Sequence, residues 1–206
     1  MLIPFSVESL IAFAVVVLAA LPLHEYGHAW MAVRLGDRTP YYQGRLTLDP
    51  RAHLDLVGTL LLAVAGFGWA KPVQFVPSNL RDAPSFKVGI VLVALAGPLM
   101  NVVIAIVAAL LLRIDIGNRT VDGILGTIVF INLLLAVFNM IPLVPLDGSK
   151  VLWGLMPDSW SRAYEQIQQY SLLILLVMIV PLGGASLLSR IISPIVVTLG
   201  QALIGF

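Results

Sequence analysis

The sequence predicts an all-α polytopic membrane protein, and three observations support this class. Of the 206 residues, 59% are hydrophobic, and only 11% are charged. A soluble domain carries about 25% charged residues because its surface must stay wetted, so this chain has too little charge for a water-exposed surface. Several uncharged stretches approach the roughly 20 apolar residues that a membrane-crossing helix needs. We expect four to six transmembrane or re-entrant helical segments.

Six apolar stretches account for these segments. They are residues 9–33, 56–70, 88–112, 123–146, 166–189 and 191–206. Residues 88–112 carry no charge and form the clearest span, whereas residues 56–70 are too few to cross, so we expect a re-entrant or interfacial segment there. Pro142 and Pro145 should break the end of the stretch 123–146. The N-terminus has no basic region and no small-residue cleavage site, so we expect the first span to be retained.

Residues 36–50 differ in character, because polar and apolar residues alternate after Gly44. Alternation with a period of two is typical of a strand, so we expect a small membrane-associated β element here. An extended peptide segment could pair with residues 44–49 by strand addition. We find no internal repeat and no linker between domains. The whole chain, 1–206, should form one membrane-embedded domain, with a catalytic core at about 8–155 and C-terminal helices at about 160–206.

The placement of lysine and arginine predicts how the chain is oriented. The basic residues between the first two clear spans are Arg34, Arg38, Arg45, Arg51, Lys71, Arg81 and Lys87, whereas the next connection holds only Arg113 and Arg119. Because cytoplasmic loops carry an excess of such residues, we expect the first connection on the cytoplasmic side. The net charge of +1 gives no sign of a nucleic-acid partner. The absence of cysteine excludes disulfides and thiolate metal sites.

Two histidines and a glutamate interrupt the first apolar stretch in the pattern H-E-x-x-H, at His24, Glu25 and His28. Residues four apart lie on one face of a helix, so both imidazoles can bind one metal ion. Zinc suits imidazole ligands, and Glu25 can take a proton from water and pass it to the leaving amine. The structural alternative is a set of buried polar residues that tie helices together, but an ionised group at the centre of a span costs at least about 3 kcal/mol. The pattern favours a zinc hydrolase.

A catalytic zinc site usually has three protein ligands, so one more is needed. Asp147 is the first candidate, because it interrupts the apolar end of the third long stretch after two prolines that break the helix. Its structural alternative is an N-cap of the segment 149–155. His53 is the rival ligand, although its charged neighbours indicate an interfacial loop.

Two motifs together resemble the site-2 protease family of intramembrane zinc metalloproteases. The first motif is H-E-Y-G-H at residues 24–28, and the second is N-M-I-P-L-V-P-L-D-G at residues 139–148. Softer matches are G-W-A-K-P at residues 68–72 and A-G-P-L-M-N at residues 96–101. The resemblance runs from about residue 20 to residue 155. The chain looks like a minimal member with no room for a PDZ-like domain.

This resemblance implies the members of the active site. One Zn²⁺ per chain would be bound by His24, His28 and Asp147, with Glu25 as the catalytic base. Asn139 would be a second catalytic residue that bonds the scissile carbonyl or the oxyanion formed from it. Its alternative is a packing amide bonded to a neighbouring backbone group. We assign Asn101 mainly to helix packing.

The same resemblance implies regulated intramembrane proteolysis. The expected substrate is a single-span membrane protein or a signal-peptide remnant. The expected location is a bacterial or archaeal cell membrane, with a multi-pass chain whose active site lies toward the cytoplasmic side. Three alternatives stay open: a metal-ion carrier or sensor, a non-catalytic scaffold that binds transmembrane helices, and a membrane hydrolase of another class. A transporter would more often show two related halves with broken helices, which this sequence lacks.

Overall fold

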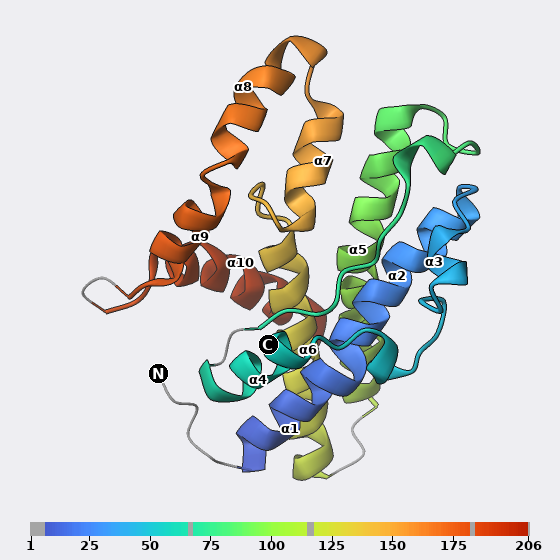
Figure 1. Ribbon diagram of the computed structural model, residues 1–206. Helices are drawn as coiled ribbons and strands as arrows, with labels where there is room; N and C mark the ends of the chain where they lie inside the picture. Colours follow the sequence, from blue (N-terminus) through green and yellow to red (C-terminus); the bar gives the residue numbers. More distant parts are fainter. Residues whose placement is uncertain (1–6, 66–67, 115–117, 182–183, 206) are drawn as a thin grey trace.

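The computed structural model describes residues 7–65, 68–114, 118–181 and 184–205, and the regular structure within these ranges is helical (Figure 1). The helices are α1 (Val7–Val15), η1 (Val16–Ala20), α2 (Leu21–Arg34), α3 (Thr39–Tyr42), η2 (Pro50–Ala52), α4 (Leu56–Ala65), η3 (Pro77–Asn79), α5 (Phe86–Leu112), α6 (Arg119–Asn139), α7 (Asp147–Leu155), α8 (Asp158–Gln168), α9 (Ser171–Ile179) and α10 (Leu187–Ile204). The all-α class expected from the composition is therefore found in the described part of the chain.

The first apolar stretch forms one helical run, because α1, η1 and α2 follow one another without a break (Figure 1). The middle piece, η1, is a π-helical turn, in which the N–H of Leu21 donates to the carbonyl of Val16. Such turns are frequent beside functional sites, since one extra residue rotates the side chains that follow. The helix that comes directly after this turn is α2, which carries the H-E-x-x-H pattern.

Helix α5 lies at the centre of the fold and packs against α2, α6 and α7. Its approach to α2 is close: a Cβ added to Gly27 would lie 2.7 Å from the carbonyl oxygen of Ala96. Small residues at such crossings let two membrane helices come into backbone contact. The close approach brings the histidine-bearing face of α2 against α5.

Among the described residues, three helices are long and apolar enough to cross a membrane, namely α5, α6 and α10. The expected span at 88–112 corresponds to α5. The stretch 123–146 is broken as its prolines predicted, because α6 ends at Asn139 and the chain passes through turns, with a cis peptide between Val144 and Pro145, before α7 begins. The last stretch, 191–206, falls largely within α10.

The β element expected within residues 36–50 does not form. This segment contains the short helix α3 followed by turns, and the pairing found nearby is a single bridge between Leu54 and Ala70. The alternating polar residues have local tasks instead. The Thr47 hydroxyl accepts a bond from the N–H of Asp49, and Asp49 caps η2. Buried Arg45 donates to the carbonyls of Ala52 and Lys71. Residues 44–49 therefore present no strand with which an extended peptide segment could pair.

The stretch 166–189 is not one continuous helix either. Its first residues belong to the end of α8, and α9 then runs only from Ser171 to Ile179. Residues 182 and 183, which follow Pro181 in this stretch, lie outside the described residues. The stretch 56–70 contains α4, whose apolar side chains are largely exposed, as a segment in contact with lipid requires.

A buried carboxylate fixes the chain that follows α2. Asp37 is fully buried and accepts hydrogen bonds from the N–H and hydroxyl of Thr39, from the N–H of Val76 and from the amide of Asn79. Burial alone would raise the pKa of Asp37, but the hydrogen bonds outweigh burial and lower it. Asp37 thus anchors the extended segment at residues 71–76 to the end of α2.

Replacing Asp37 by Asn should lower the free energy of unfolding by about 2 kcal/mol at neutral pH, because bonds to a charged acceptor are lost. A carboxylate with a lowered pKa in the folded state stabilises the protein above its unfolded pKa of about 3.9, and this contribution fades as the pH falls toward the folded value. The difference between wild type and Asp37→Asn should therefore stay constant above about pH 5 and shrink as the pH falls below about 4. Thermal unfolding in detergent measures it, with the exposed Asp82→Asn as control. Equal losses for both variants would contradict the assignment.

Candidate metal centre

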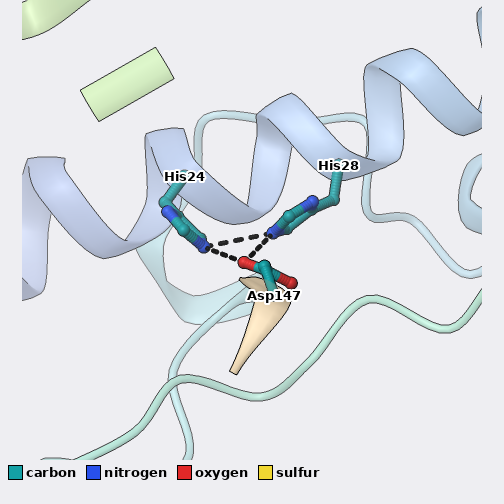
Figure 2. A group of neighbouring side chains, drawn as sticks. All are labelled: His24, His28 and Asp147. Carbon is teal, nitrogen blue, oxygen red and sulfur yellow. Dashed lines mark hydrogen bonds and ion pairs between the residues drawn. The ribbon is translucent and has the colours of Figure 1, made fainter. Parts of the chain in front are cut away.

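His24, His28 and Asp147 converge on one point (Figure 2). The two histidines lie on the same face of α2, and Asp147 reaches them from the first residue of α7. Oδ2 of Asp147 lies 3.2 Å from Nε2 of His24 and 3.0 Å from Nε2 of His28, and the two Nε2 atoms are 3.1 Å apart. All three residues are buried. Segments more than a hundred residues apart thus supply one cluster.

The tautomer of His24 follows from its neighbours. The amide nitrogen of Asn101 donates to the backbone carbonyl of Ala20 at 3.3 Å and to Oδ1 of Asn132 at 2.8 Å. Asn132 is oriented in turn, because its own amide nitrogen donates to the carbonyl of Ile128. A carbonyl can only accept, so Oδ1 of Asn101 faces Nδ1 of His24, at 2.6 Å. Nδ1 of His24 must therefore carry the proton.

The tautomer of His28 is fixed in the same way, since its Nδ1 lies 2.7 Å from the backbone carbonyl of Val93. In the neutral imidazoles both Nε2 atoms then present lone pairs, and so does the carboxylate oxygen of Asp147. Three lone pairs face one another at hydrogen-bond distance with no proton among them. A shared cation resolves this repulsion, and a metal ion can be bound by all three atoms at once.

The donor set fits a zinc ion. Zinc takes imidazole nitrogen and carboxylate oxygen at about 2.0–2.2 Å, so tetrahedral ligands around it lie roughly 3.4 Å apart, close to the separations found here. Three protein ligands also leave a position open for a substrate or water, as catalytic zinc sites do. The second oxygen of Asp147, Oδ1, lies 3.2 Å from Nζ of Lys150. Lys150 thereby leaves Oδ2 as the oxygen that faces the histidines.

Two glycines make room for this cluster. A Cβ added to Gly97 on α5 would lie 2.3 Å from Nε2 of His28 and 2.7 Å from Nε2 of His24. A Cβ added to Gly148 would lie 2.2 Å from the carbonyl oxygen of Met140. Gly97 therefore leaves space at the metal position itself, whereas Gly148 lets the turn before α7 fold back on the end of α6.

Glu25 is buried beside the cluster and lines the same cavity. Its Oε2 accepts a hydrogen bond of 3.0 Å from the N–H of Val73, in the extended segment at residues 71–76. The structure gives Oε1 no hydrogen-bond partner among the residues that it describes. One oxygen thus orients the carboxylate, and the other is free to exchange a proton.

Asn139 lies at the end of α6 and also lines the cavity. Its amide nitrogen donates to the carbonyl of Leu135, one turn earlier in the same helix, at 3.0 Å. One of the two amide protons is thus used locally, as the packing alternative expects, and the second is available to a ligand. The oxyanion role of Asn139 stays a prediction.

The cavity over the cluster has a volume of about 480 Å³. Its polar side is formed by the cluster, Glu25, Asn139 and Lys150, and much of the remainder is apolar. The apolar wall includes Leu172, Leu175, Leu176 and Ile179 of α9 and Leu135 and Phe138 of α6. Such a cavity suits a hydrophobic segment whose peptide bond reaches the polar side.

The structure does not bring His53 to the cluster. His53 is fully buried in the loop before α4, where its Nε2 donates to the carbonyl of Thr47 at 2.8 Å. Asp147 does not act as an N-cap, because α7 already begins at this residue and its N-cap position is Leu146, which makes no side-chain bond.

Sequence reasoning missed the side chains that orient the ligands. It assigned Asn101 mainly to packing and did not consider Asn132 or Lys150. The signal was present in part: Asn101 and Asn132 are amides within uncharged apolar stretches, where an unpaired polar group is costly. Their partners, however, become visible only when α2, α5 and α6 are packed together.

Comparison with known proteins gives consistent relatives. The profile of Peptidase family M50 matches residues 114–182. Several relatives carry the name "Putative zinc metalloprotease". Among them, YwhC of Bacillus subtilis is 37% identical over 85% of this chain and 84% of its own length. Rip2 of Mycobacterium tuberculosis is 32% identical over 78% of this chain and 63% of its own length. MJ0611 of Methanocaldococcus jannaschii is 32% identical over 76% of each chain. No solved structure gives a significant match.

Replacing Gly97 by Ala should abolish metal binding, because the new methyl group would overlap the atoms that hold the ion. We expect a loss of affinity of about 100-fold or more, the upper range for changes around metal ligands. Titration of the purified protein with zinc against a competing chelator measures it. Gly126→Ala in α6 is the matched control, since no atom lies within 4 Å of the added Cβ. Unchanged affinity in Gly97→Ala would show that the ion binds elsewhere.

Proposed function

Because the chain belongs to peptidase family M50, the site-2 protease family of zinc metalloproteases, we propose that it is an intramembrane zinc endopeptidase. In this proposal it hydrolyses peptide bonds in or near the transmembrane segments of other membrane proteins. The relative YwhC supports the family assignment over most of both chains. The helices long and apolar enough to span a membrane support the location.

One observation carries the proposal. Three lone pairs, two from imidazoles with fixed tautomers and one from Asp147, converge at 3.0–3.2 Å in a buried position that adjoins an apolar cavity. A purely structural cluster would need an extra proton on an imidazole to pair with Asp147, whereas one metal ion can take up all three lone pairs at once. A carboxylate, Glu25, faces the same cavity, so a ligand set and a proton acceptor occur together as hydrolysis requires.

The chemistry assigns a task to each side chain. Zinc held by His24, His28 and Asp147 would supply a Lewis acid that polarises the scissile carbonyl and activates water as a nucleophile. Glu25 accepts a proton from the attacking water as the new carbon–oxygen bond forms. Glu25 then delivers this proton to the peptide nitrogen as the carbon–nitrogen bond breaks, so that an amine and a carboxylic acid result.

Asn139 is proposed to stabilise the charge that develops on the carbonyl oxygen. Its second amide proton is available for this bond, and the local bond to Leu135 would hold the amide in place. A donor that is positioned before the reaction loses little free energy to reorientation when the charge develops. Lys150 lies on the same side of the cavity and contributes a positive charge beside Asp147.

The proposed substrates are single-span membrane proteins or signal-peptide remnants. The apolar wall formed by α9 and α6 supports this choice, since it suits a segment from the bilayer better than a polar peptide. A substrate helix must unwind locally, because intrahelical bonds otherwise occupy its carbonyls. We further propose a single multi-pass domain in a bacterial or archaeal membrane, with the site toward the cytoplasm, on the basis of the lysine and arginine distribution.

Replacing Glu25 by Gln should separate binding from catalysis. We expect the variant to retain about one zinc per chain and to lose cleavage of a model transmembrane peptide by at least about 100-fold, since a general base contributes that much. Asp147→Ala should lose both properties. Metal analysis and peptide cleavage of the purified proteins in detergent provide the two readouts.

The outcomes that contradict the proposal are distinct. Cleavage retained by Glu25→Gln would remove Glu25 from its assigned role. A wild-type protein that binds zinc but cleaves no transmembrane peptide would favour a metal carrier or a scaffold over a protease. Zinc retained at full affinity in Asp147→Ala would exclude the three-ligand site.

A further inference from the structure

The turn region that precedes Asp147 needs hydrogen-bond partners from outside. Residues 140–146 have no regular structure, and backbone groups near a membrane must be paired within the protein. Two bonds form inside the region: Leu143 donates to Ile141, and Leu146 donates to Leu143, both at 2.8 Å. The N–H of Val144 and the carbonyl of Pro142 have no backbone partner within residues 140–146.

A single side chain pairs both groups. Oε1 of Gln168 accepts from the N–H of Val144 at 2.9 Å, and Nε2 of Gln168 donates to the carbonyl of Pro142 at 3.0 Å. The side-chain amide of Gln168 thus bonds the turn region in the same way as a backbone peptide group of a neighbouring strand would. Tyr164, one turn earlier on α8, donates to the carbonyls of Pro142 and Ser149, at 3.3 and 2.9 Å. Both side chains therefore hold the turn region and the first residues of α7.

Gln168 also connects this region to the cavity wall. It is the last residue of α8, and the hydroxyl of Ser171, at the start of α9, donates to its Oε1. The same helix, α9, lines the cavity with four apolar side chains. One amide thus joins the segment that bears Asp147 to the helix that would contact a substrate.

We propose that Gln168 is a positioning residue for the metal centre, with Tyr164 in support. By fixing the turn region it sets the position of the Asp147 carboxylate relative to the two imidazoles, and it makes α9 and Asp147 shift together. This inference rests on the proposed function, because it assumes that the cluster binds a metal ion. Small displacements matter here, since a shift of about 1 Å at a reacting group can cost 100-fold in rate.

The chain offers a matched control beside Gln168. Gln169 is exposed, and its Nε2 donates to the carbonyl of Gln166 within the same helix. Replacement of either glutamine by Met keeps the length of the side chain and removes the amide. Tyr164→Phe removes one hydroxyl and keeps the ring, so it tests the supporting contact with little change in packing.

The experiment uses the full-length protein in detergent with zinc and with cobalt as probes. Competition with a chelator gives the affinity for zinc, and the cobalt absorption spectrum reports ligand geometry. We expect Gln168→Met to bind zinc about tenfold more weakly and to show a shifted cobalt spectrum, with a smaller change in Tyr164→Phe and none in Gln169→Met. Thermal unfolding of the metal-free proteins is measured in parallel.

Two results would overturn the inference. One is wild-type affinity and an unshifted spectrum in Gln168→Met. The other is a lower unfolding temperature of that variant without any change in the metal site, which would assign Gln168 a structural role alone. If the wild-type protein itself binds neither zinc nor cobalt, the proposed function fails first. The failure of the two proposals can therefore be told apart.

Discussion

The structure depends on three atoms, Nε2 of His24, Nε2 of His28 and Oδ2 of Asp147, that present lone pairs to one another when both imidazoles are neutral. Backbone carbonyls can only accept hydrogen bonds. The carbonyl of Val93 therefore places the proton of His28 on Nδ1, and the carbonyl of Ala20 does the same for His24 by orienting the amide of Asn101. The opposite nitrogens must then accept, as Asp147 does. Two neutral imidazoles and a carboxylate repel in this arrangement, so burial of the cluster favours a shared cation, either a proton or a metal ion. The suitability of the cluster for a metal ion thus follows from hydrogen bonds made on the far side of each imidazole ring.

Much of the fold supports this cluster of two histidines and one aspartate. Gly27 lets α2 and α5 touch, Gly97 leaves the space between the imidazoles, and the amides of Asn101 and Asn132 cross from α2 through α5 to α6. The irregular region before α7 supplies Asp147 from the opposite side, and α8 pairs its backbone. In a bilayer each of these polar groups must find a protein partner, which makes the arrangement strict.

The sequence carried enough information for the class, for α5, for the break after α6 and for His24 and His28 on one helix face, and it made Asp147 the first of two candidates for the third position. These features follow from local rules: apolar length, proline, and a spacing of four on a helix. The orienting amides and Gln168 could not be foreseen, because their partners are distant in the chain. The prediction of a β element at residues 36–50 was wrong, because alternating polar side chains can cap turns as well as line a strand.

X-ray absorption at the zinc edge of the purified protein tests the central claim most directly. The account predicts one zinc per chain, with nitrogen and oxygen ligands at about 2.0–2.2 Å and the outer-shell scattering of two imidazoles. Scattering from a single imidazole, or from three, would contradict it, and three would bring His53 into the site. A protein that retains no zinc would remove the basis of the account.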